Sequence, residues 1–144
     1  MLTGLDILAR NPGIAKDWGR CGLLCNQASV THDLVPAWRV ASQALGDRLK
    51  SLFGPQHGFE STVQDNMIET GHAVHRHSGL RVFSLYADSR RPTEPMLRDI
   101  DTFIVDMQIV GCRVYTWKGS IFEILTACRE FGKRVVVLDR PNPL

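Results

Sequence analysis

The 144-residue sequence has little that would point directly to a function class. It contains no run of Lys and Arg, and its formal net charge is only +2, so neither nucleic acid nor an anionic membrane is an expected partner. No stretch approaches the roughly 18 consecutive apolar residues of a membrane span. Asp6 and Arg10 interrupt the first residues, where no cleavage site follows. This pattern does not fit a signal peptide, so the sequence predicts a cytoplasmic location.

Cysteine is also scarce and lacks a functional spacing. The four residues are Cys21, Cys25, Cys112 and Cys128. Cys21 and Cys25 fall on one expected strand with three residues between them, which is neither a redox nor a zinc spacing. We therefore expect reduced, mostly buried thiols and no disulfide.

No cofactor is expected either. His72, His75 and His77 are close in sequence, but no carboxylate or thiol in the same loop completes a metal-binding set. This favours solvated loop histidines and no metal. The sequence contains neither a Gly-x-Gly-x-x-Gly fingerprint nor a Walker loop, and no Gly-x-Ser-x-Gly elbow. Dinucleotide, P-loop and serine-hydrolase signatures are therefore absent from the sequence.

What is present is a regular alternation of strands and helices. Apolar runs predict strands over 21–25, 48–53, 81–86, 102–107 and 134–138. Helices are expected over 36–45, after Thr93, and from a capping box at Ser120 and Glu123 to a stop at Gly132. Parallel strands need crossover connections, so this order predicts an α/β, Rossmann-like, doubly wound and mostly parallel sheet of about five strands, with helices on both faces. By length, residues 1–144 form a single domain.

Polar residues follow the end of every expected strand. In a doubly wound sheet the carboxyl ends of the parallel strands lie at the same end of the sheet, where ligands bind. The residues are Asn26, Gln27, Gln56, His57, Glu60, Tyr86, Arg90, Arg91, Asp106, Gln108, Arg113, Tyr115, Asp139, Arg140 and Asn142. Asp106 and Arg140 are expected to form an ion pair, because a lone carboxylate at a buried strand tip would be costly to desolvate.

The loop from Gly54 to Glu60 is the most informative segment. Gly54 and Pro55 end the preceding strand, since Pro has no N–H to donate to a sheet. An amide, an imidazole and a carboxylate then follow within five residues, as Gln56, His57 and Glu60. Residues 54–79 have no clear period, and a loop of this length in a compact domain is typically functional. The alternative is an ordinary turn with a surface histidine.

Five segments together resemble one known family. They are Gly22–Asn26, Leu52–Gly58, Ser84–Tyr86 followed by Arg91–Thr93, Asp106–Thr116, and Val137–Pro143. Over roughly residues 20–144, the chain resembles the exo-β-N-acetylmuramidase family of bacterial peptidoglycan recycling. The resemblance implies the N-terminal Rossmann-like domain of a two-domain glycoside hydrolase that releases N-acetylmuramic acid from the non-reducing end of its substrate. A C-terminal α/β domain, outside this chain, would complete the active site.

The resemblance also implies roles for the residues at the strand ends. The expected catalytic residues are Gln56, His57, Glu60 and Asp106. The expected substrate-binding residues are Asn26, Gln108, Arg113, Tyr115, Asp139, Arg140 and Asn142. The expected partner is a muramic-acid-containing sugar, with the C-terminal domain or a second copy as a further partner. Arg113 and Arg140 are the best candidates to bind the lactyl carboxylate of that sugar.

Two positions depart from the family pattern. Gln56 stands where the family usually has Glu, and Ile109 where it usually has Asp. An amide cannot protonate a departing sugar oxygen as a carboxylic acid can. Three alternatives follow: Glu60 supplies the acid, Gln56 only binds substrate, or activity is lost. The main hypothesis is therefore one half of a muramidase that is inactive by itself. The second is a non-catalytic carbohydrate-binding or remnant domain.

Overall fold

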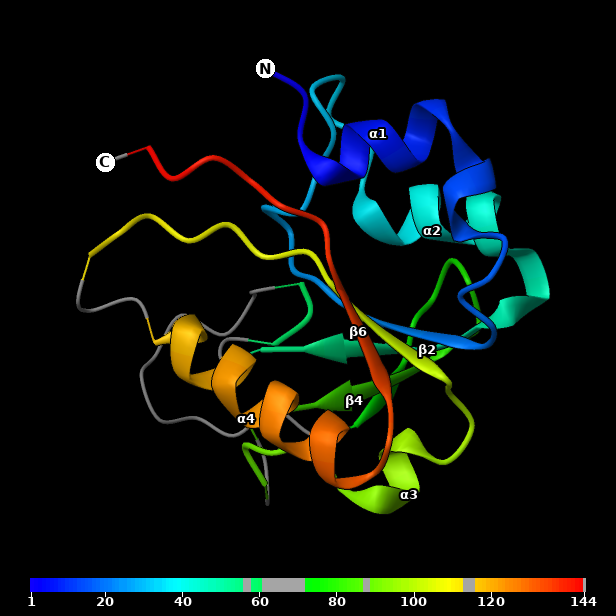
Figure 1. Cartoon of the computed structure of the whole chain (residues 1–144), viewed down its shortest axis with the longest axis vertical. Coiled ribbons are helices and arrows are strands. Elements are labelled where there is room, and N and C mark those ends of the chain that lie inside the picture. The colour runs from blue at the N-terminus through cyan, green and yellow to red at the C-terminus, as the bar shows by residue number, and fades with distance from the viewer. Residues whose placement is uncertain (56–57, 61–71, 87–88, 113–115, 144) are drawn as a thin grey trace.

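The computed structural model describes residues 1–55, 58–60, 72–86, 89–112 and 116–143 (Figure 1). The helices are α1 (Gly4–Arg10), α2 (Ala37–Leu45), α3 (Glu94–Leu97) and α4 (Trp117–Glu130), with short 3₁₀ turns η1 (Pro12–Ala15) and η2 (Gly46–Arg48). The strands are β1 (Cys21–Leu24), β2 (Leu49–Gly54), β3 (Ala73–Val74), β4 (Arg81–Ser84), β5 (Thr102–Val105) and β6 (Arg134–Val137). Within the described residues, every helix is too short or too polar to cross a membrane.

The strands form one sheet in the order β3-β4-β2-β1-β5-β6. Every neighbouring pair is parallel except β3 with β4, which confirms the predicted fold class. The order runs outward from β1 through β2 to β4 and then resumes on the other side with β5. This reversal between β1 and β5 is the point at which doubly wound sheets bind ligands. The sixth strand, β3, was not predicted, because two residues are too few to show a periodic pattern.

The central strands are apolar because helices cover both of their faces. All four residues of β1 and of β5 are buried. Leu5, Leu8 and Val40 of α1 and α2 belong to the core on one face, and Leu97 and Ile124 of α3 and α4 to the core on the other. Continuous burial on two sides explains why these strands read as uninterrupted hydrophobic runs.

Helix boundaries differ from the sequence prediction at two places. α1 was not predicted, although Thr3 and Asp6 form a capping box in which Thr3 N–H donates to Asp6 Oδ2 at 2.8 Å. The expected start of α4 at Ser120 is wrong, because the helix begins at Trp117. Trp117 packs against the core, which extends the helix toward its amino end. Ser and Glu three residues apart also occur inside helices, so that spacing alone does not define a boundary.

The cysteines agree with the prediction of free thiols. Cys21, Cys25 and Cys128 are buried, Cys112 is half-buried, and none forms a disulfide. Burial raises the pKa of the Cys21 and Cys128 thiols to about 11. Their thiolate forms are therefore scarce at neutral pH, which makes them structural rather than reactive groups.

The histidine segment differs from the prediction, because His75 is not solvated. Only 5% of its surface is exposed, and its ring lies edge-on to Trp38 at 4.6 Å and to Phe59 at 5.2 Å between ring centroids. His75 Nδ1 is also 2.8 Å from Ser78 Oγ. His75 thus joins the turn after β3 to α2 and to the segment after β2. Across the described ranges, no group of three or more His, Cys, Asp or Glu side chains could hold a metal ion.

Candidate functional site

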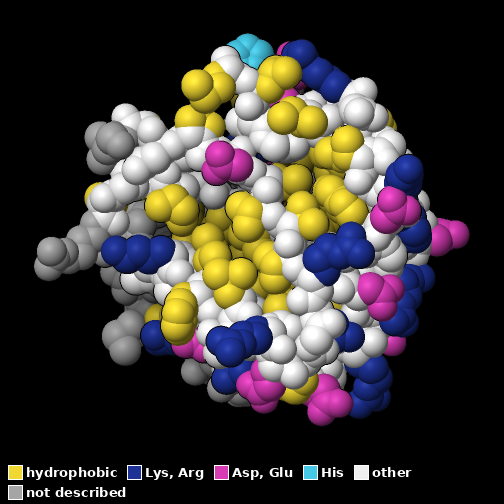
Figure 2. Space-filling model, in the orientation of Figure 1, with side chains coloured by type: hydrophobic (Ala, Val, Ile, Leu, Met, Phe, Trp, Pro, Cys, Tyr) yellow, Lys and Arg dark blue, Asp and Glu magenta, His cyan; other side chains and the backbone are white. Residues whose placement is uncertain are grey.

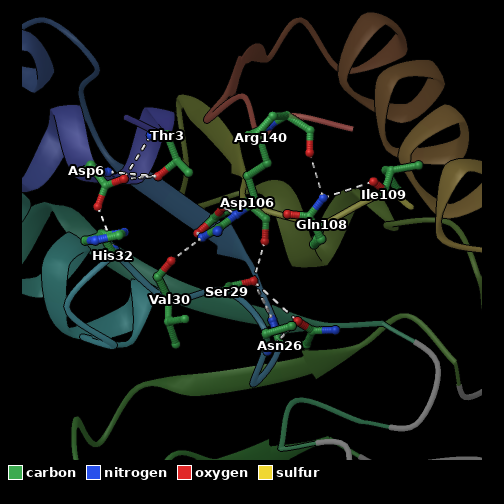
Figure 3. A network of polar contacts seen from close by, with 12 residues as sticks. Thr3, Asp6, Asn26, Ser29, Val30, His32, Asp106, Gln108, Ile109 and Arg140 are labelled. Carbon is green, nitrogen blue, oxygen red and sulfur yellow. Dashed lines mark hydrogen bonds and ion pairs between the residues drawn. The ribbon is translucent and has the colours of Figure 1, made fainter. Parts of the chain in front are cut away.

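The segments that follow β1 and β5 meet where the strand order reverses. Asn26 follows β1, and Asp106 follows β5 directly. Ser29 connects them: its hydroxyl donates to the backbone carbonyl of Asp106 at 2.5 Å and accepts from the backbone N–H of Asn26 at 3.1 Å (Figure 3). All three residues are buried. The two segments are therefore joined by a buried polar network and are not a pair of independent loops.

Asp106 and Arg140 form the ion pair that the sequence predicted. Arg140 Nε is 2.5 Å from Asp106 Oδ1, and Arg140 Nη2 is 2.8 Å from Oδ2, which is a bidentate geometry. The Asp106 side chain is fully buried and that of Arg140 is 6% exposed. Burial raises the pKa of Asp106, and the guanidinium opposes that rise by stabilising the carboxylate. Arg140 Nη2 also donates to the carbonyl of Val30 at 3.0 Å, which ties the segment after β6 to the segment after β1.

A second carboxylate supports this network from the side of α1. Asp6 accepts hydrogen bonds from the backbone N–H groups of Thr3 and His32, the latter at 2.8 Å to Oδ1. Burial by itself would raise the pKa of Asp6, but these hydrogen bonds outweigh it and lower the pKa to about 2. Asp6 is therefore ionised at neutral pH. Asp6 at His32 and Arg140 at Val30 together hold the later part of the segment that follows β1.

The segments after β5 and β6 lie side by side. Gln108 Nε2 donates to the carbonyl of Ile109 at 3.0 Å and to that of Pro141 at 3.1 Å. Gly111 adopts a φ of 72°, and a Cβ atom at this position would lie 3.0 Å from the side-chain amide of Asn142. This close approach explains why a glycine stands there. Asp139 and Asn142 are exposed, so their side chains can meet a ligand from solvent.

The structure brings together six of the predicted site residues on this side of the sheet. They are Asn26, Asp106, Gln108, Asp139, Arg140 and Asn142. Gln56, His57, Arg113 and Tyr115 lie outside the described residues. Their roles stay predictions.

Glu60 is described and exposed, in the segment after β2. This segment folds back over the end of the strand, because a Cβ atom on Gly54 would be 2.8 Å from the backbone nitrogen of Phe59. Arg91 was expected in the crevice but instead forms an ion pair with Glu130. Glu130 ends α4 just before β6 begins, so Arg91 lies toward the amino-terminal ends of the strands, away from the site.

Sequence reasoning missed Ser29, which makes the shortest link between the two central segments. One local signal was available. Asn26 Oδ1 accepts from the backbone N–H of Ala28 at 3.0 Å, which is the Asx turn that Asn residues commonly form. The partner of Ser29 is 77 residues away in the chain, and no local pattern could identify it.

Comparison with known proteins agrees with this architecture. Residues 21–144 match the profile of the family described as exo-beta-N-acetylmuramidase NamZ, N-terminal. The chain belongs to the NamZ family. It is 34% identical over 141 residues to the peptidoglycan beta-N-acetylmuramidase NamZ of Bacillus subtilis (strain 168), covering 98% of this chain and 34% of that protein.

Two solved structures of DUF1343 family proteins from Bacteroides fragilis NCTC 9343 have the same fold. One is 34% identical with a TM-score of 0.85, and the other is 24% identical with a TM-score of 0.75. Each superposition covers 99% of this chain and 35% of the solved chain. The chain thus spans about a third of the length of its NamZ and DUF1343 relatives, and the polar site described above belongs to a NamZ N-terminal domain.

Proposed function

We propose that this chain is the N-terminal part of an exo-acting β-N-acetylmuramidase and that its crevice binds the muramic-acid end of peptidoglycan fragments. The observation that carries the proposal is the match to the NamZ N-terminal family over residues 21–144. The geometry supports it, because the predicted polar residues gather where the strand order reverses.

The Asp106–Arg140 pair acts in this proposal mainly as a rigid support. Both carboxylate oxygens of Asp106 are engaged and its side chain has no exposed surface, so reaching a sugar oxygen would require the pair to open. Breaking such a buried pair is costly. Asp139 and Asn142 are exposed beside it and are the better placed groups for direct contact with sugar hydroxyls.

Hydrolysis of a glycoside generally needs two carboxyl groups on opposite sides of the bond. In this proposal one comes from the segment after β2, where exposed Glu60 is the described carboxylate. The other comes from the part of the enzyme outside these 144 residues. We therefore expect this chain by itself to bind the sugar without hydrolysing it at a useful rate.

Calorimetric titration tests the proposed ligand. N-acetylmuramic acid should bind the chain more tightly than N-acetylglucosamine, which is the matched control because it differs only in lacking the 3-O-lactyl group that carries the carboxylate. A charge-assisted hydrogen bond to that carboxylate is worth about 1.5–3 kcal/mol, so the affinities should differ by roughly tenfold or more. Equal affinities, or no binding of either sugar, would contradict the proposal.

A further inference from the structure

A second pocket lies at the amino-terminal ends of the strands, between α3 and the first residues of β2 and β4. We call it the amino-end pocket. Its volume is about 570 Å³, which is within the usual range for a small-molecule site. β4 begins at Arg81, and β1 begins just after Arg20. Asp106 and Arg140 follow the carboxyl ends of their strands, so a ligand in the amino-end pocket would lie away from the polar site described above.

Three cationic side chains line the amino-end pocket. They belong to Arg20, Lys50 and Arg81, which are all exposed. The Arg81 guanidinium lies over the ring of Phe83, with Cζ 5.6 Å from the ring centroid, and this ring lines the same pocket. Arg20 is held in place by Asp101, to which its Nε and Nη2 donate at 3.0 and 2.8 Å. Among the described residues, neither Lys50 nor Arg81 forms an ion pair, so both charges are available to a ligand.

The balance of charge favours an anion. One carboxylate, that of Asp99, lines the pocket together with the three cations. Lys50 and Arg81 outnumber it even when the Arg20–Asp101 pair is counted as neutral. Figure 2 shows charged side chains of both signs along the lower rim of the face in view, where Figure 1 places α3, whereas hydrophobic side chains gather in the middle. This end of the sheet is therefore suited to a charged ligand.

A buried hydroxyl is the second observation that points to a ligand. Ser51 lines the pocket and is 4% exposed, and its Oγ atom has no hydrogen-bond partner among the described residues. The strand register places Ser51 between Gly22 and Arg81. Its Oγ atom would lie 3.2 Å from a Cβ atom on Gly22, on the face of the sheet that α3 and α4 cover. An unpaired buried hydroxyl is costly, and an oxygen of a bound anion beside Arg81 would pair it.

The rest of the lining is apolar. Phe83 of β4 is half-buried, and Pro95 and Met96 of α3 lie across the pocket from the strands. An inorganic ion would leave this apolar part unused. A ligand that contacts both parts has an anionic head and an apolar body.

We propose that the amino-end pocket binds a small organic anion, either a phosphate or a carboxylate. Its oxygens pair with Arg81, Lys50 and the Ser51 hydroxyl, and its apolar body packs against Phe83 and Met96. Guanidinium and ammonium groups bind both kinds of oxyanion through charge-assisted hydrogen bonds. The site is independent of the proposed sugar site, because it lies at the opposite ends of the strands and needs no hydrolysis.

Titration followed by two-dimensional NMR tests the proposal, with phenyl phosphate and benzoate as anionic probes and benzyl alcohol as the uncharged control. The probe that binds more tightly identifies the preferred head group. It should shift the amide resonances of Ser51, Phe83 and Met96 and leave those of Asn26 and Asp106 unchanged. Inorganic phosphate should bind at least about fivefold more weakly than phenyl phosphate, because it lacks the apolar body. Binding of neither anion, equal binding of benzyl alcohol or of inorganic phosphate, or shifts confined to Asn26 and Asp106 would overturn the proposal.

A matched pair of arginine substitutions locates the charge that binds. Arg81→Gln should weaken binding of the tighter probe at least about fivefold, because it removes a charge-assisted hydrogen bond. Arg39→Gln is the control, because Arg39 makes a similar contact with Trp38, at 5.8 Å from Cζ to the ring centroid, outside the pocket. It should change the affinity by less than about twofold. Equal losses in the two variants would assign binding to overall charge and overturn the proposal.

Ser51→Ala tests the buried hydroxyl with two readouts. Binding of the tighter probe should weaken at least about threefold, because a hydrogen bond to the ligand is lost. The melting temperature of the free chain should stay the same or rise, because the variant removes an unpaired buried hydroxyl. A variant that binds the probe as tightly as the parent chain, or one that melts several degrees lower without ligand, would contradict the role proposed for Ser51.

Discussion

The two edges of the sheet are built in different ways. At one edge, β3 is only two residues long, and the chain then turns so that buried His75 packs between Trp38 and Phe59. At the other edge, β6 is longer, carries three valines, and is held to the domain at its carboxyl end by the Arg140–Asp106 pair. A short strand closed by side-chain packing leaves little to pair with another chain. Among the described strands, β6 pairs with β5 alone and leaves Val137 exposed.

The largest effect should come from breaking the anchor of the β6 edge. Arg140→Ala leaves Asp106 charged and buried without its partner, so we expect the free energy of unfolding to fall by about 3–5 kcal/mol. Urea denaturation followed by circular dichroism measures it. Arg140→Lys is the conservative control and should recover part of the loss, since an ammonium keeps the charge but not the bidentate geometry. A loss below about 1 kcal/mol for Arg140→Ala would show that the anchor is not structural.

The opposite edge should respond to pH through His75. Burial lowers the pKa of this imidazole, with a further contribution from His77, while nearby Glu60 acts in the other direction. The unfolded state therefore binds a proton at higher pH than the folded state, and stability falls as pH drops below the ordinary histidine pKa of about 6.5. His75→Gln should reduce this pH dependence in thermal melts between about pH 5 and pH 8. An unchanged slope in that variant would assign the dependence to other groups.

A smaller effect is expected from α1, which supports the end of β6. The Gly4 N–H donates to the Asp139 carbonyl at 2.8 Å, and the Thr3 side chain caps the helix that begins there. Thr3→Ala removes the capping hydrogen bond and should cost about 1 kcal/mol. Thr3→Ser keeps the hydroxyl and should cost less. If both variants lower the free energy of unfolding equally, the methyl group of Thr3, and not its capping hydroxyl, matters at this position.

The smallest effect should come from the exposed ion pair between Arg91 and Glu130, which belongs to neither edge. Both side chains are substantially exposed, so water and salt screen the pair. Arg91→Ala should change the free energy of unfolding by about 1 kcal/mol or less, in contrast to Arg140→Ala. Urea denaturation of Arg91→Ala and Arg140→Ala under the same conditions compares their losses in the free energy of unfolding. Comparable losses would mean that burial does not explain the difference between the pairs.

Much of the fold could be predicted because the local patterns agree with one another. Strand runs such as Thr102–Val105 are apolar throughout, and α2 ends where Gly46 adopts a φ of 56°, as the position of that glycine suggested. The elements that were missed or misplaced are either very short or have boundaries that depend on packing. β3 is too short for a period, and α4 begins early because Trp117 joins the core.

The candidate site divides in a similar way. The position of Asp106 and Arg140 at strand ends could be predicted, because the carboxyl ends of parallel strands all lie at the same end of the sheet. Ser29 could not, since its contact with Asp106 spans 77 residues and depends on how the segment after β1 turns. The same limit applies to His75, which looked like a solvated loop residue until its neighbours from α2 and the segment after β2 were known.

The sequence by itself determined the α/β class, the strand-end residues and the resemblance to a muramidase family, because these depend on periodicity, turn chemistry and motif order. Only the tertiary structure decided that the Asp106–Arg140 pair is almost entirely buried, that His75 is buried, and that β6 lies at an edge among the described strands. Burial and pairing depend on residues far apart in the chain. A valine run has the same local pattern whether one neighbouring strand or two lie beside it, so only the order of strands in space could show that a side of β6 is open.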